Sequence, residues 1–543
     1  MSVKICVAQV NTAVGGIKGN TQKIISEIKN AEKQGADIIV FPELTITGYP
    51  PEDLLFKKSF VRENIQAVKK ASRAAGGITA VIGFVNHEKG HIFNSAAIAQ
   101  KGRIKGIYNK VILPNYGVFD EKRYFTSGGK IYIFKKGGLR FGVTICEDMW
   151  QESKLLKTMK KKTDAIINLS ASPYHTAKWK QRKKLFSKRA SQYASYFIYA
   201  NLVGGQDEVV FDGYSMVMDK KGRMLAAGRQ FAEDRVYTEL LSGNSAAKKE
   251  SAGGFARKTG SPGQPEEIYG ALVLGTRDYI IKNGFKKAVV ALSGGIDSAL
   301  VSVIAADALG PENVDIIYMP SAYSAKVSLK NSKKLAKNLG IKLKIIDIRS
   351  LVDVYSKKLK PYFKGTKKGT AEENLQSRIR GNLIMAFSNK FGSMVLTTGN
   401  KSEMSVGYAT LYGDMAGGFA VIKDVPKTMV YELARDKNRM AGFELIPESI
   451  INRVPTAELK PNQKDADTLP PYPVLDRIIG DYIENDKMFN DLKNKYDKAL
   501  LKKVIKMIDK NEYKRRQAPP GVKITPKAFG RDRRMPVTNK YSI

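Results

Sequence analysis

Three side chains in the first third of the chain have the types that acyl transfer requires. Cys146 ends the apolar run RFGVTIC, Glu43 ends ADIIVFPE, and Lys110 lies in YNKVILPNYGVFDEKRYF. A thiol attacks a carbonyl only as the thiolate, so it needs a base and a positive neighbour. A carboxylate takes the proton, and an ammonium stabilises the oxyanion of the intermediate. The three residues are therefore a candidate nucleophile, base and oxyanion partner.

The elements that must position these side chains are buried strands. Residues 1–240 alternate amphipathic segments with apolar runs such as KICVAQV, ITAVIGFV and DAIINLSA. Continuous apolar runs of about four to eight residues are typical of strands that are buried on both faces, with helices between them. α/β folds place their chemistry at the ends of such strands. Cys6, by contrast, alternates inside a strand without polar neighbours, and we interpret it as structural.

The flanking sequence carries a family resemblance. FPELTITGYPPEDLL, NKVILPNYGVFDE and GVTICEDMW occur in this order, and together they resemble the nitrilase (carbon–nitrogen hydrolase) superfamily over about residues 1–240. The resemblance implies an αββα sandwich that hydrolyses amides through a thioester. It implies that Glu43 is the general base, Lys110 the oxyanion partner and Cys146 the nucleophile. Glu121, in FDE, resembles the supporting second glutamate of that family.

The amide substrate is indicated by two further segments. LPNYG and NLSASPYHTAKW resemble the glutaminase domains of this superfamily, which implies that Tyr116, Ser172 and Lys178 hold the α-amino and carboxylate ends of glutamine. A zwitterionic ligand needs a cation and several neutral hydrogen bonds, so these residue types are appropriate. Lys178 also lies in the Lys/Arg-dense stretch 154–189, where a solvated side chain is the alternative interpretation.

The second half of the chain contains a glycine-rich turn that could bind phosphate. AVVALSGGIDSALVSVIA places SGGIDS between a predicted strand and a predicted helix. Glycines let backbone N–H groups approach an anion, and a helix N-terminus favours negative charge. The hydroxyls of Ser293 and Ser298 are donors, whereas Asp297 is suited to a Mg²⁺ ion that bridges phosphates. The motif lacks the GKS or GKT ending of a Walker A loop, and it resembles the PP-loop of ATP pyrophosphatases.

The surrounding pattern predicts a second α/β domain. KKAVVALSGG, NVDIIYMP, KLKIIDI and SMVLTTGN are strand-like runs separated by helical segments, which predicts a doubly wound parallel sheet. We predict a hydrolase domain over 1–241, a Gly/Ser/Ala/Lys-rich linker over 242–265, and an ATP pyrophosphatase domain over 266–543. The basic last thirty residues are either a disordered tail or a flap folded over a site.

Segments of the second half resemble one family over nearly the whole chain. ENLQSRIRGNLIMAFSN, LTTGNKSEMSVGYATLYGDMAGG, IPESIINRVPTAEL, DADTLPPYPVLD and EYKRRQAPPGVKITPKAFGRDRRMP are similar to the glutamine-dependent NAD synthetases. The resemblance implies that the ATP phosphates are wrapped by Ser293, Gly294, Gly295, Ile296, Asp297 and Ser298. It implies ATP contact by Thr398, and deamido-NAD contact by Asn374, Glu403 and Lys514. It also implies Mg²⁺ ligation by Asp297 and Glu403.

Four further residues are second-line expectations from the same resemblance. Asp414 and Lys423 are expected near the substrates. Arg378 and Arg380 either face phosphates or are surface arginines of a helix. The sequence does not separate these two alternatives.

The resemblance implies a two-site reaction. ATP adenylates the nicotinate carboxylate of deamido-NAD, and ammonia from glutamine displaces AMP to give NAD⁺, pyrophosphate and glutamate. Ammonia is mostly protonated in neutral water, so an internal tunnel is implied. The expected partners are these small molecules, and the family implies a homo-oligomer.

Composition excludes several other classes. Two cysteines in 543 residues rule out a disulfide scaffold and a four-cysteine zinc site. With no long apolar run and no basic-then-apolar start, we expect no membrane span and a cytoplasmic protein. Lys and Arg outnumber Asp and Glu by 91 to 52, giving +39. This charge keeps a PP-loop RNA-modifying enzyme as the alternative, with salt-sensitive tRNA binding. We expect no specific nucleic acid, because that alternative leaves the tail motifs unexplained.

Overall fold

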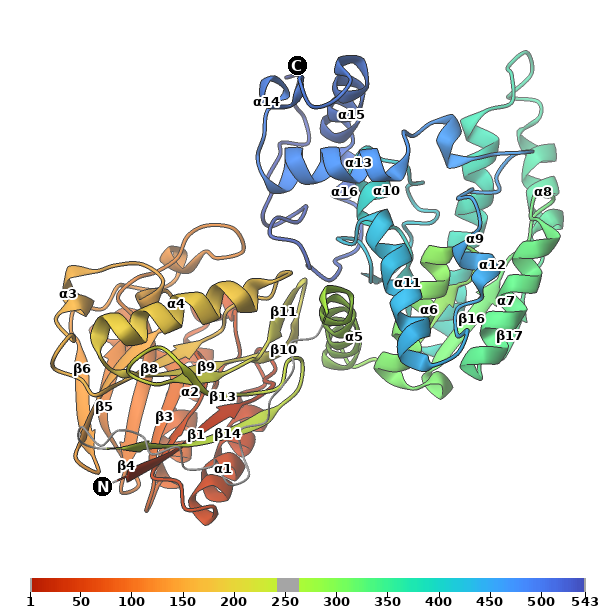
Figure 1. The fold of residues 1–543 in the computed structure, drawn as a ribbon. Coiled ribbons are helices and arrows are strands. Elements are labelled where there is room, and N and C mark those ends of the chain that lie inside the picture. Colours follow the sequence, from red (N-terminus) through yellow and green to blue (C-terminus); the bar gives the residue numbers. More distant parts are fainter. Residues whose placement is uncertain (1, 242–262, 542–543) are drawn as a thin grey trace. The chain divides into compact units, whose positions relative to one another are not determined.

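The chain forms two compact units, residues 1–261 and 262–543. The computed structural model describes residues 2–241 and 263–541, and Figure 1 shows their course. Most of the predicted linker, 242–265, therefore lies outside the described residues. Its last two positions belong to helix α5 (Gln264–Lys282), which has a proline in its first turn.

The first unit contains two six-stranded sheets. The strands of the first sheet, in order, are β14 (Asp234–Leu241), β1 (Ser2–Gln9), β2 (Ile38–Val40), β3 (Thr79–Glu88), β4 (His91–Gln100) and β5 (Arg103–Asn109). Those of the second are β13 (Met224–Ala227), β12 (Met216–Met218), β9 (Tyr196–Asn201), β8 (Ala165–Ser170), β7 (Leu139–Ile145) and β6 (Tyr132–Lys136). A hairpin of β10 (Val203–Gln206) and β11 (Val209–Asp212) stands beside them.

Strand β1 explains why the sequence runs are continuously apolar. Ile5 and Val7 belong to the core shared by strands of both sheets, whereas Cys6 and Ala8 belong to the core under the helices α1 and α2. Successive side chains of a strand point to opposite faces, so a strand between two cores needs apolar residues at every position. The αββα prediction is confirmed.

Short and long helices complete this unit. They are α1 (Ile17–Lys33), α2 (Lys58–Arg73), α3 (Lys154–Lys157), α4 (Lys178–Tyr193) and the 3₁₀ turns Glu52–Phe56, Glu121–Arg123 and Cys146–Met149. Phe186 and Ala190 of α4 pack with Phe197 and Tyr199 of β9, so α4 covers the second sheet. This arrangement places the start of α4 near the turn that follows β7.

The second unit contains a five-stranded parallel sheet, as predicted. Its order is β17 (Leu343–Ile345), β16 (Val314–Tyr318), β15 (Lys287–Ala291), β18 (Ser393–Thr397) and β19 (Phe419–Ala420). The chain moves outward from β15 to β17 and then returns to the other side of β15 as β18. This reversal creates the switch point at which doubly wound sheets bind ligands.

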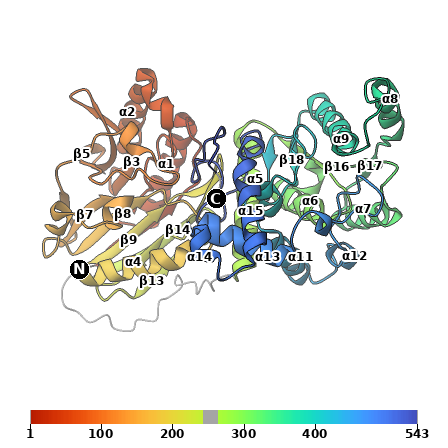
Figure 2. The same cartoon turned by 90° about the horizontal axis from the view of Figure 1, so that it is seen from above.

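The helices of this unit follow the strands. They are α6 (Ile296–Leu309), α7 (Lys326–Leu339), α8 (Arg349–Leu359), α9 (Thr370–Phe391), α10 (Lys401–Val406), α11 (Lys427–Ala441), α12 (Glu448–Ile451), α13 (Tyr472–Ile479), α14 (Phe489–Leu492), α15 (Lys498–Lys510) and α16 (Glu512–Arg515). Shorter turns are the 3₁₀ helices Pro311–Asn313 and Asp465–Asp467 and the π-helix Gly480–Glu484. Helices α8 and α9 lie side by side, as Figure 2 shows.

A separate apolar cluster joins α10, α13 and α15. Helix α15 buries Leu501, Val504, Ile505 and Ile508, the spacing of one helix face, against Leu475 of α13. The chain after α16 has no long regular element, but its residues 521–525 are buried rather than loose. This part of the tail is therefore packed against the unit, and its role as a flap over a site stays a prediction. Among residues 2–241 and 263–541, no helix is long and apolar enough to cross a membrane.

Candidate active sites

A buried ammonium lies between two buried carboxylates in the first unit. Nζ of Lys110 donates to Oε1 of Glu43 at 2.7 Å and to Oε1 of Glu121 at 2.9 Å. Glu43 follows β2, Lys110 follows β5, and Glu121 begins a 3₁₀ turn. The three residues are distant in sequence and meet at the ends of their elements. One ammonium therefore lies between two carboxyl groups, and all three side chains are almost completely buried.

Further groups orient these carboxylates. Glu43 accepts from Nδ2 of Asn94 at 2.7 Å and from the backbone N–H of Ala171 at 2.8 Å. Glu121 accepts from the hydroxyl of Tyr49 at 2.9 Å. The charged carboxylates are thus held by several hydrogen bonds, which is how buried charges are retained. Asn94 and Tyr49 were not singled out from the sequence, because neither lies in a recognisable acid–base pattern.

Cys146 lies in the turn directly after β7. Its φ of 40° is in the left-handed region, which is uncommon for a non-glycine residue and typical of functional turns. Asp148 closes the turn by accepting from the N–H of Ile145 at 2.9 Å. The same carboxylate accepts from the N–H of Ile112 at 2.8 Å, so it links the Cys146 turn to the segment after Lys110. Asp148 lies in the sequence segment ICEDM, but the sequence does not indicate that it contacts the loop after β5.

The site perturbs the acidities of its groups. Burial raises the pKa of the Cys146 thiol well above its usual value, and the charge of Glu43 raises it further against the opposing Lys110. Burial raises the pKa of Glu121 to about 7 despite the neighbouring Lys110. Burial alone would lower the pKa of Lys110, but Glu121 and Glu43 raise it well above its usual range. The resting state is therefore a protonated thiol beside a permanent ammonium.

The three predicted glutamine contacts lie around this turn. The hydroxyl of Tyr116 donates to Oε2 of Glu147 at 3.0 Å, directly beside Cys146. Ser172 follows Ala171, whose N–H contacts Glu43, and its own N–H donates to Oδ1 of Asn201 at 2.9 Å. Nζ of Lys178 lies 4.1 Å from the ring centroid of Trp150, the residue that ends the Cys146 turn. The buried Glu147 is an addition that the sequence patterns did not indicate.

The SGGIDS turn joins β15 to α6. The N–H of Ser293 donates to Oγ of Ser298 at 3.1 Å, and the N–H of Gly295 donates to Oγ of Ser293 at 3.3 Å. Gly294 has a φ of +83°, and a Cβ there would lie 2.5 Å from the carbonyl oxygen of Ser328. A side chain is excluded at Gly294 on both grounds. Ile296 begins α6 and is buried, so it anchors the turn.

Both predicted magnesium ligands contact one lysine. Lys427 forms ion pairs with Oδ2 of Asp297 and, at 3.2 Å, with Oε1 of Glu403. Asn400 links the two segments, since its Nδ2 donates to the carboxylate of Asp297 at 3.0 Å and its Oδ1 accepts from the backbone N–H of Glu403 at 3.0 Å, which caps α10. Burial raises the pKa of Glu403 to about 7, with Lys427 opposing. Lys427 was not predicted from the sequence, where it lies in DVPKTMVYELAR.

A pocket lies beside this carboxylate pair. It is lined by Thr397, Gly399, Glu403, Met404, Ala409, Asp414, Met415, Ala420, Ala518 and Pro519. We call it the Glu403 pocket. Thr398 stands between two of its lining residues, and Asp414 lines it directly. The pocket is formed where β18 and β19 end and where the folded tail begins.

Other predicted contacts surround the Glu403 pocket. Oδ1 of Asn374 accepts from the hydroxyl of Thr410 at 2.8 Å. Nζ of Lys514 donates to the carbonyls of Gly407 and Ala409 at 2.7 and 2.9 Å, and Ala409 lines the pocket. Nζ of Lys423 donates to the carbonyl of Pro519 at 2.8 Å. Each is therefore hydrogen-bonded to the loop or tail that forms the wall.

The two arginines of α9 differ. Arg378 is exposed, and its Nε donates to the carbonyl of Leu411 at 3.2 Å. Arg380 is half-buried, and its Nε donates to the carbonyl of Met319 at the end of β16 at 2.9 Å. Arg380 is therefore not a solvated surface arginine.

Comparison with known proteins agrees with both halves of the chain. A carbon–nitrogen hydrolase model matches residues 4–249, and an NAD synthase model matches residues 268–518. The glutamine-dependent NAD(+) synthetases of Thermotoga maritima and Acinetobacter baylyi are 46% and 42% identical, each covering 99% of both chains. The chain belongs to the glutamine-dependent NAD(+) synthetase family.

Solved structures of this family show the same fold. The glutamine-dependent NAD⁺ synthetase from Acinetobacter baumannii, solved with ADP, is 42% identical and has a TM-score of 0.79 over 99% of this chain and 98% of that one. That of Cytophaga hutchinsonii has a TM-score of 0.85 at 22% identity, with the same coverage, which shows the fold alone.

The donor set of the synthetase unit fits a magnesium ion brought with a nucleotide. Mg²⁺ is usually held by one or two carboxylates together with substrate phosphates and water. Asp297 and Glu403 supply two carboxylates beside the SGGIDS turn. Within residues 2–241 and 263–541, no group of three or more His, Cys, Asp or Glu side chains is arranged to hold a metal by itself.

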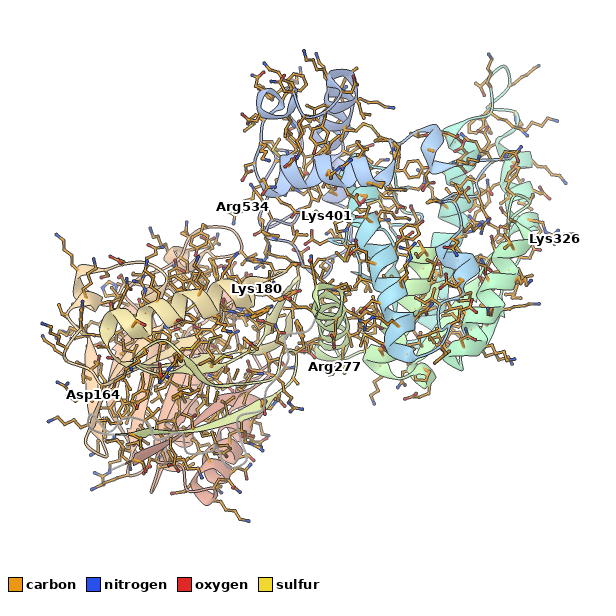
Figure 3. All side chains as sticks on the ribbon, in the orientation of Figure 1. Asp164, Lys180, Arg277, Lys326, Lys401 and Arg534 are labelled. Atoms are coloured by element: carbon orange, nitrogen blue, oxygen red, sulfur yellow. The ribbon has the colours of Figure 1, made fainter. Side chains whose placement is uncertain are left out.

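The basic charge of this synthetase-family chain is spread over both units. Figure 3 shows long side chains projecting from each, including the exposed Lys180 of α4 and Lys326 of α7. The full-length relatives account for the tail motifs that an RNA-modifying enzyme left unexplained. The RNA-modifying alternative is therefore not favoured.

Proposed function

We propose that this chain catalyses the ATP-dependent amidation of deamido-NAD to NAD⁺, using ammonia from glutamine. The observation that carries the proposal is the coexistence, on one chain, of the closed Glu43–Lys110–Cys146 site and the SGGIDS turn beside Asp297 and Glu403. Family membership over the full length supports it. The substrates are small molecules, and the free thiol of Cys146 suits a reducing cytoplasm. We also expect a homo-oligomer.

In the glutaminase half, Glu43 accepts the proton of the Cys146 thiol as the sulfur attacks the side-chain amide. The ammonium of Lys110 stabilises the oxyanion that forms, because it is already positioned and needs no rearrangement. Glu43 then returns the proton to the leaving ammonia, and water clears the thioester to give glutamate. Glu121 holds Lys110 in place.

The ends of glutamine have matching partners near Cys146. The buried carboxylate of Glu147, with the hydroxyl of Tyr116, suits the α-ammonium group. Lys178 suits the α-carboxylate, and the loop at Ser172 supplies neutral hydrogen bonds. A cation and an anion that pair with the α-carboxylate and the α-ammonium group, both of which are on Cα, select a free amino acid over a simple amide.

In the synthetase half, the N–H groups of residues 293–298 bind the ATP phosphates at the start of α6. Asp297 and Glu403 would hold Mg²⁺, which offsets negative charge on the departing pyrophosphate. Lys427 holds these two carboxylates together before the nucleotide binds. Thr398 contacts ATP, and Asn374, Glu403 and Lys514 contact deamido-NAD around the Glu403 pocket.

The activation step explains the need for ATP. A carboxylate is a poor electrophile, but its adenylate loses AMP readily when ammonia attacks. The test is a product assay with deamido-NAD, Mg-ATP and either glutamine or ammonium. NAD⁺ and AMP are expected with both nitrogen sources, and their absence with both would overturn the proposal.

A further inference from the structure

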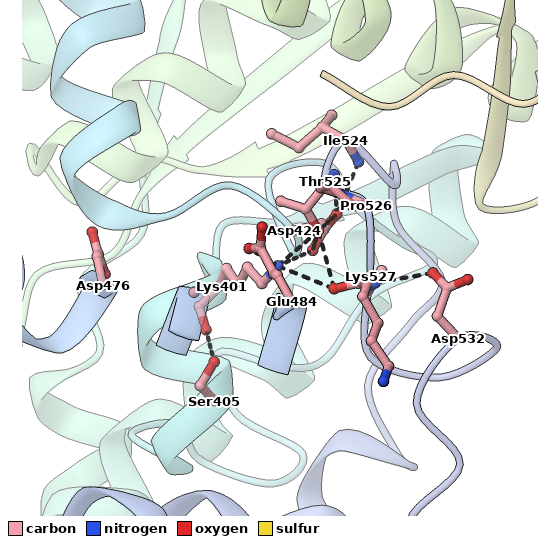
Figure 4. Close-up of polar contacts among 12 residues, drawn as sticks. Lys401, Ser405, Asp424, Asp476, Glu484, Ile524, Thr525, Pro526, Lys527 and Asp532 are labelled. Atoms are coloured by element: carbon pink, nitrogen blue, oxygen red, sulfur yellow. Dashed lines mark hydrogen bonds and ion pairs between the residues drawn. The ribbon is translucent and has the colours of Figure 1, made fainter. Parts of the chain in front are cut away.

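We propose that Lys401 is a positioning residue that holds the start of the folded tail against the Glu403 pocket. We call residues 518–532 the strap. Lys401 is fully buried, and its ammonium donates to Oε1 of Glu484 at 2.7 Å and to the hydroxyl of Thr525 at 2.7 Å (Figure 4). It also pairs with Asp424 at 2.9 Å. The inference rests on the proposed function, because it treats the Glu403 pocket as a substrate site.

Asp424 is the partner that receives the strap. It accepts from the backbone N–H groups of Ile524 and Thr525 at 2.9 and 2.8 Å, and from the Thr525 hydroxyl. A buried carboxylate with these bonds still carries a full charge, which the Lys401 ammonium balances. Lys401 also donates to the carbonyl of Lys527 at 3.4 Å. The Lys401 ammonium therefore completes a buried cluster with Asp424 and Glu484. This cluster binds both the backbone and the Thr525 side chain of the strap.

The held segment leads directly into the pocket wall. Ala518 and Pro519 line the Glu403 pocket. The N–H of Ala420, another lining residue, donates to the carbonyl of Pro520 at 2.8 Å. A Cβ on Gly521 would lie 2.0 Å from the carbonyl oxygen of Ala420, so the strap and β19 touch backbone to backbone. A shift of the strap near Thr525 therefore moves the wall itself.

The other end of the link is the helix that carries Glu403. Lys401 is the first residue of α10, and its N–H donates to the carbonyl of Val425 at 2.9 Å. Glu403 lies two residues further along the same helix. Lys401 thus joins the helix that carries Glu403 to the segment whose start, Ala518 and Pro519, also lines the pocket. An ion pair that contributed only to stability could lie anywhere in the core, whereas the Lys401–Asp424 pair connects two segments that both lead to the Glu403 pocket.

The test compares variants of the full chain with free ammonium as the nitrogen source. Thr525→Val removes the hydroxyl at nearly constant shape, Thr525→Ser keeps it, and Lys401→Met removes the ammonium. The free energy of a hydrogen bond to a charged group corresponds to a change of about tenfold or more in an equilibrium constant. We expect Thr525→Val and Lys401→Met to raise KM for deamido-NAD and Mg-ATP about tenfold, with a smaller change in kcat. Thr525→Ser should resemble the parent.

Lys527→Met is the matched control. Its ammonium pairs with the exposed Asp486, whereas only its carbonyl faces Lys401. This variant should keep the parent KM. Thr525→Val reports the outcome if Lys401→Met does not fold. Unchanged KM values in Thr525→Val, or the same rise in Lys527→Met, would overturn the proposal.

Limited trypsin digestion provides a readout that does not depend on activity. The strap contains Lys523, which is buried, and Lys527 and Arg531, which are half-buried, and release from Asp424 should make the peptide bonds after all three more accessible. Faster cleavage at these sites is expected in Thr525→Val and Lys401→Met, but not in Thr525→Ser. A parent chain that makes no NAD⁺ refutes the proposed function, and the cleavage rates then decide the role of Lys401. Equal cleavage rates in all variants would overturn that role.

Discussion

Arg182 of α4 and Asp212 at the end of β11 form an ion pair in which both side chains are fully excluded from water. The same guanidinium donates to the carbonyl of Ser172 at 3.4 Å. Gln230 adds a hydrogen bond to Asp212 at 3.3 Å. The pair therefore connects the helix that begins with Lys178 to the loop that carries Ser172.

We predict that the effect of replacing Arg182 on the free energy of unfolding depends strongly on whether Asp212 is present. Arg182→Met leaves a buried carboxylate without its cation, which costs about 3–5 kcal/mol of unfolding free energy. The double variant Arg182→Met/Asp212→Leu should be more stable than Arg182→Met alone, because no uncompensated charge remains. Calorimetric unfolding of the parent and of the two variants measures this. A double variant that is no more stable than Arg182→Met would contradict the prediction.

Cys146→Ala should separate the two nitrogen sources. The substitution removes the nucleophile but no group of the synthetase unit, so NAD⁺ synthesis from glutamine should fall to background. Synthesis from ammonium should stay near that of the parent. The same NAD⁺ assay, run with each source, gives the comparison. Cys6→Ala is the control, because Cys6 lies in the core of β1 and should leave both rates intact. Loss of both activities in Cys146→Ala would argue against separable sites.

Asp297→Asn should abolish synthesis with either nitrogen source. The amide keeps the shape but loses the charge that pairs with Lys427 and that a Mg²⁺ ion requires. Labelling of Cys146 by an electrophilic glutamine analogue should persist, which shows that the glutaminase site is still formed. Asp436→Asn is a control, since that carboxylate pairs with Arg439 on α11. Synthesis that survives in Asp297→Asn would refute the magnesium role.

Glu121 should make the first unit less stable as pH rises. Burial raises its folded pKa from 4.5 to about 7, so the folded state binds the proton more tightly than the unfolded state. The contribution is complete below pH 4.5 and is lost as pH rises through about 7. Relative to Glu121→Gln, the parent should lose on the order of 3 kcal/mol across this window. Urea unfolding of both chains across this pH range tests the sign, and a parent that gains stability would contradict it.

The sequence predicted the strands well because burial on both faces leaves a local record. Val7 and Ala8 point into different cores, so the β1 run is apolar at every position. The start of α5 was harder to locate. Composition assigned residues 264 and 265 to the linker, whereas the helix begins at Gln264. Proline is compatible with the first turn of a helix, so a Pro-rich stretch does not by itself exclude one.

The residues of the candidate sites also fall into those that the sequence indicated and those that it did not. Glu43, Lys110, Cys146 and the SGGIDS turn were indicated because each has a characteristic flank. Asn94 and Lys427 were not, because their importance lies only in their partners. Asn94 contacts Glu43 from 51 residues away, and Lys427 contacts Asp297 from 130 residues away. No local pattern encodes such a pairing.

The sequence by itself determined the kinds of chemistry: a thiol with a base and a cation, and a phosphate-binding turn with a carboxylate. Tertiary structure alone decided which charges meet, as when Lys401 joins Asp424 to Thr525 of the strap. The physical reason is that local sequence records burial and backbone conformation. Charge pairing depends on which strand ends the sheets bring together, and buried charges are retained only where those ends supply partners.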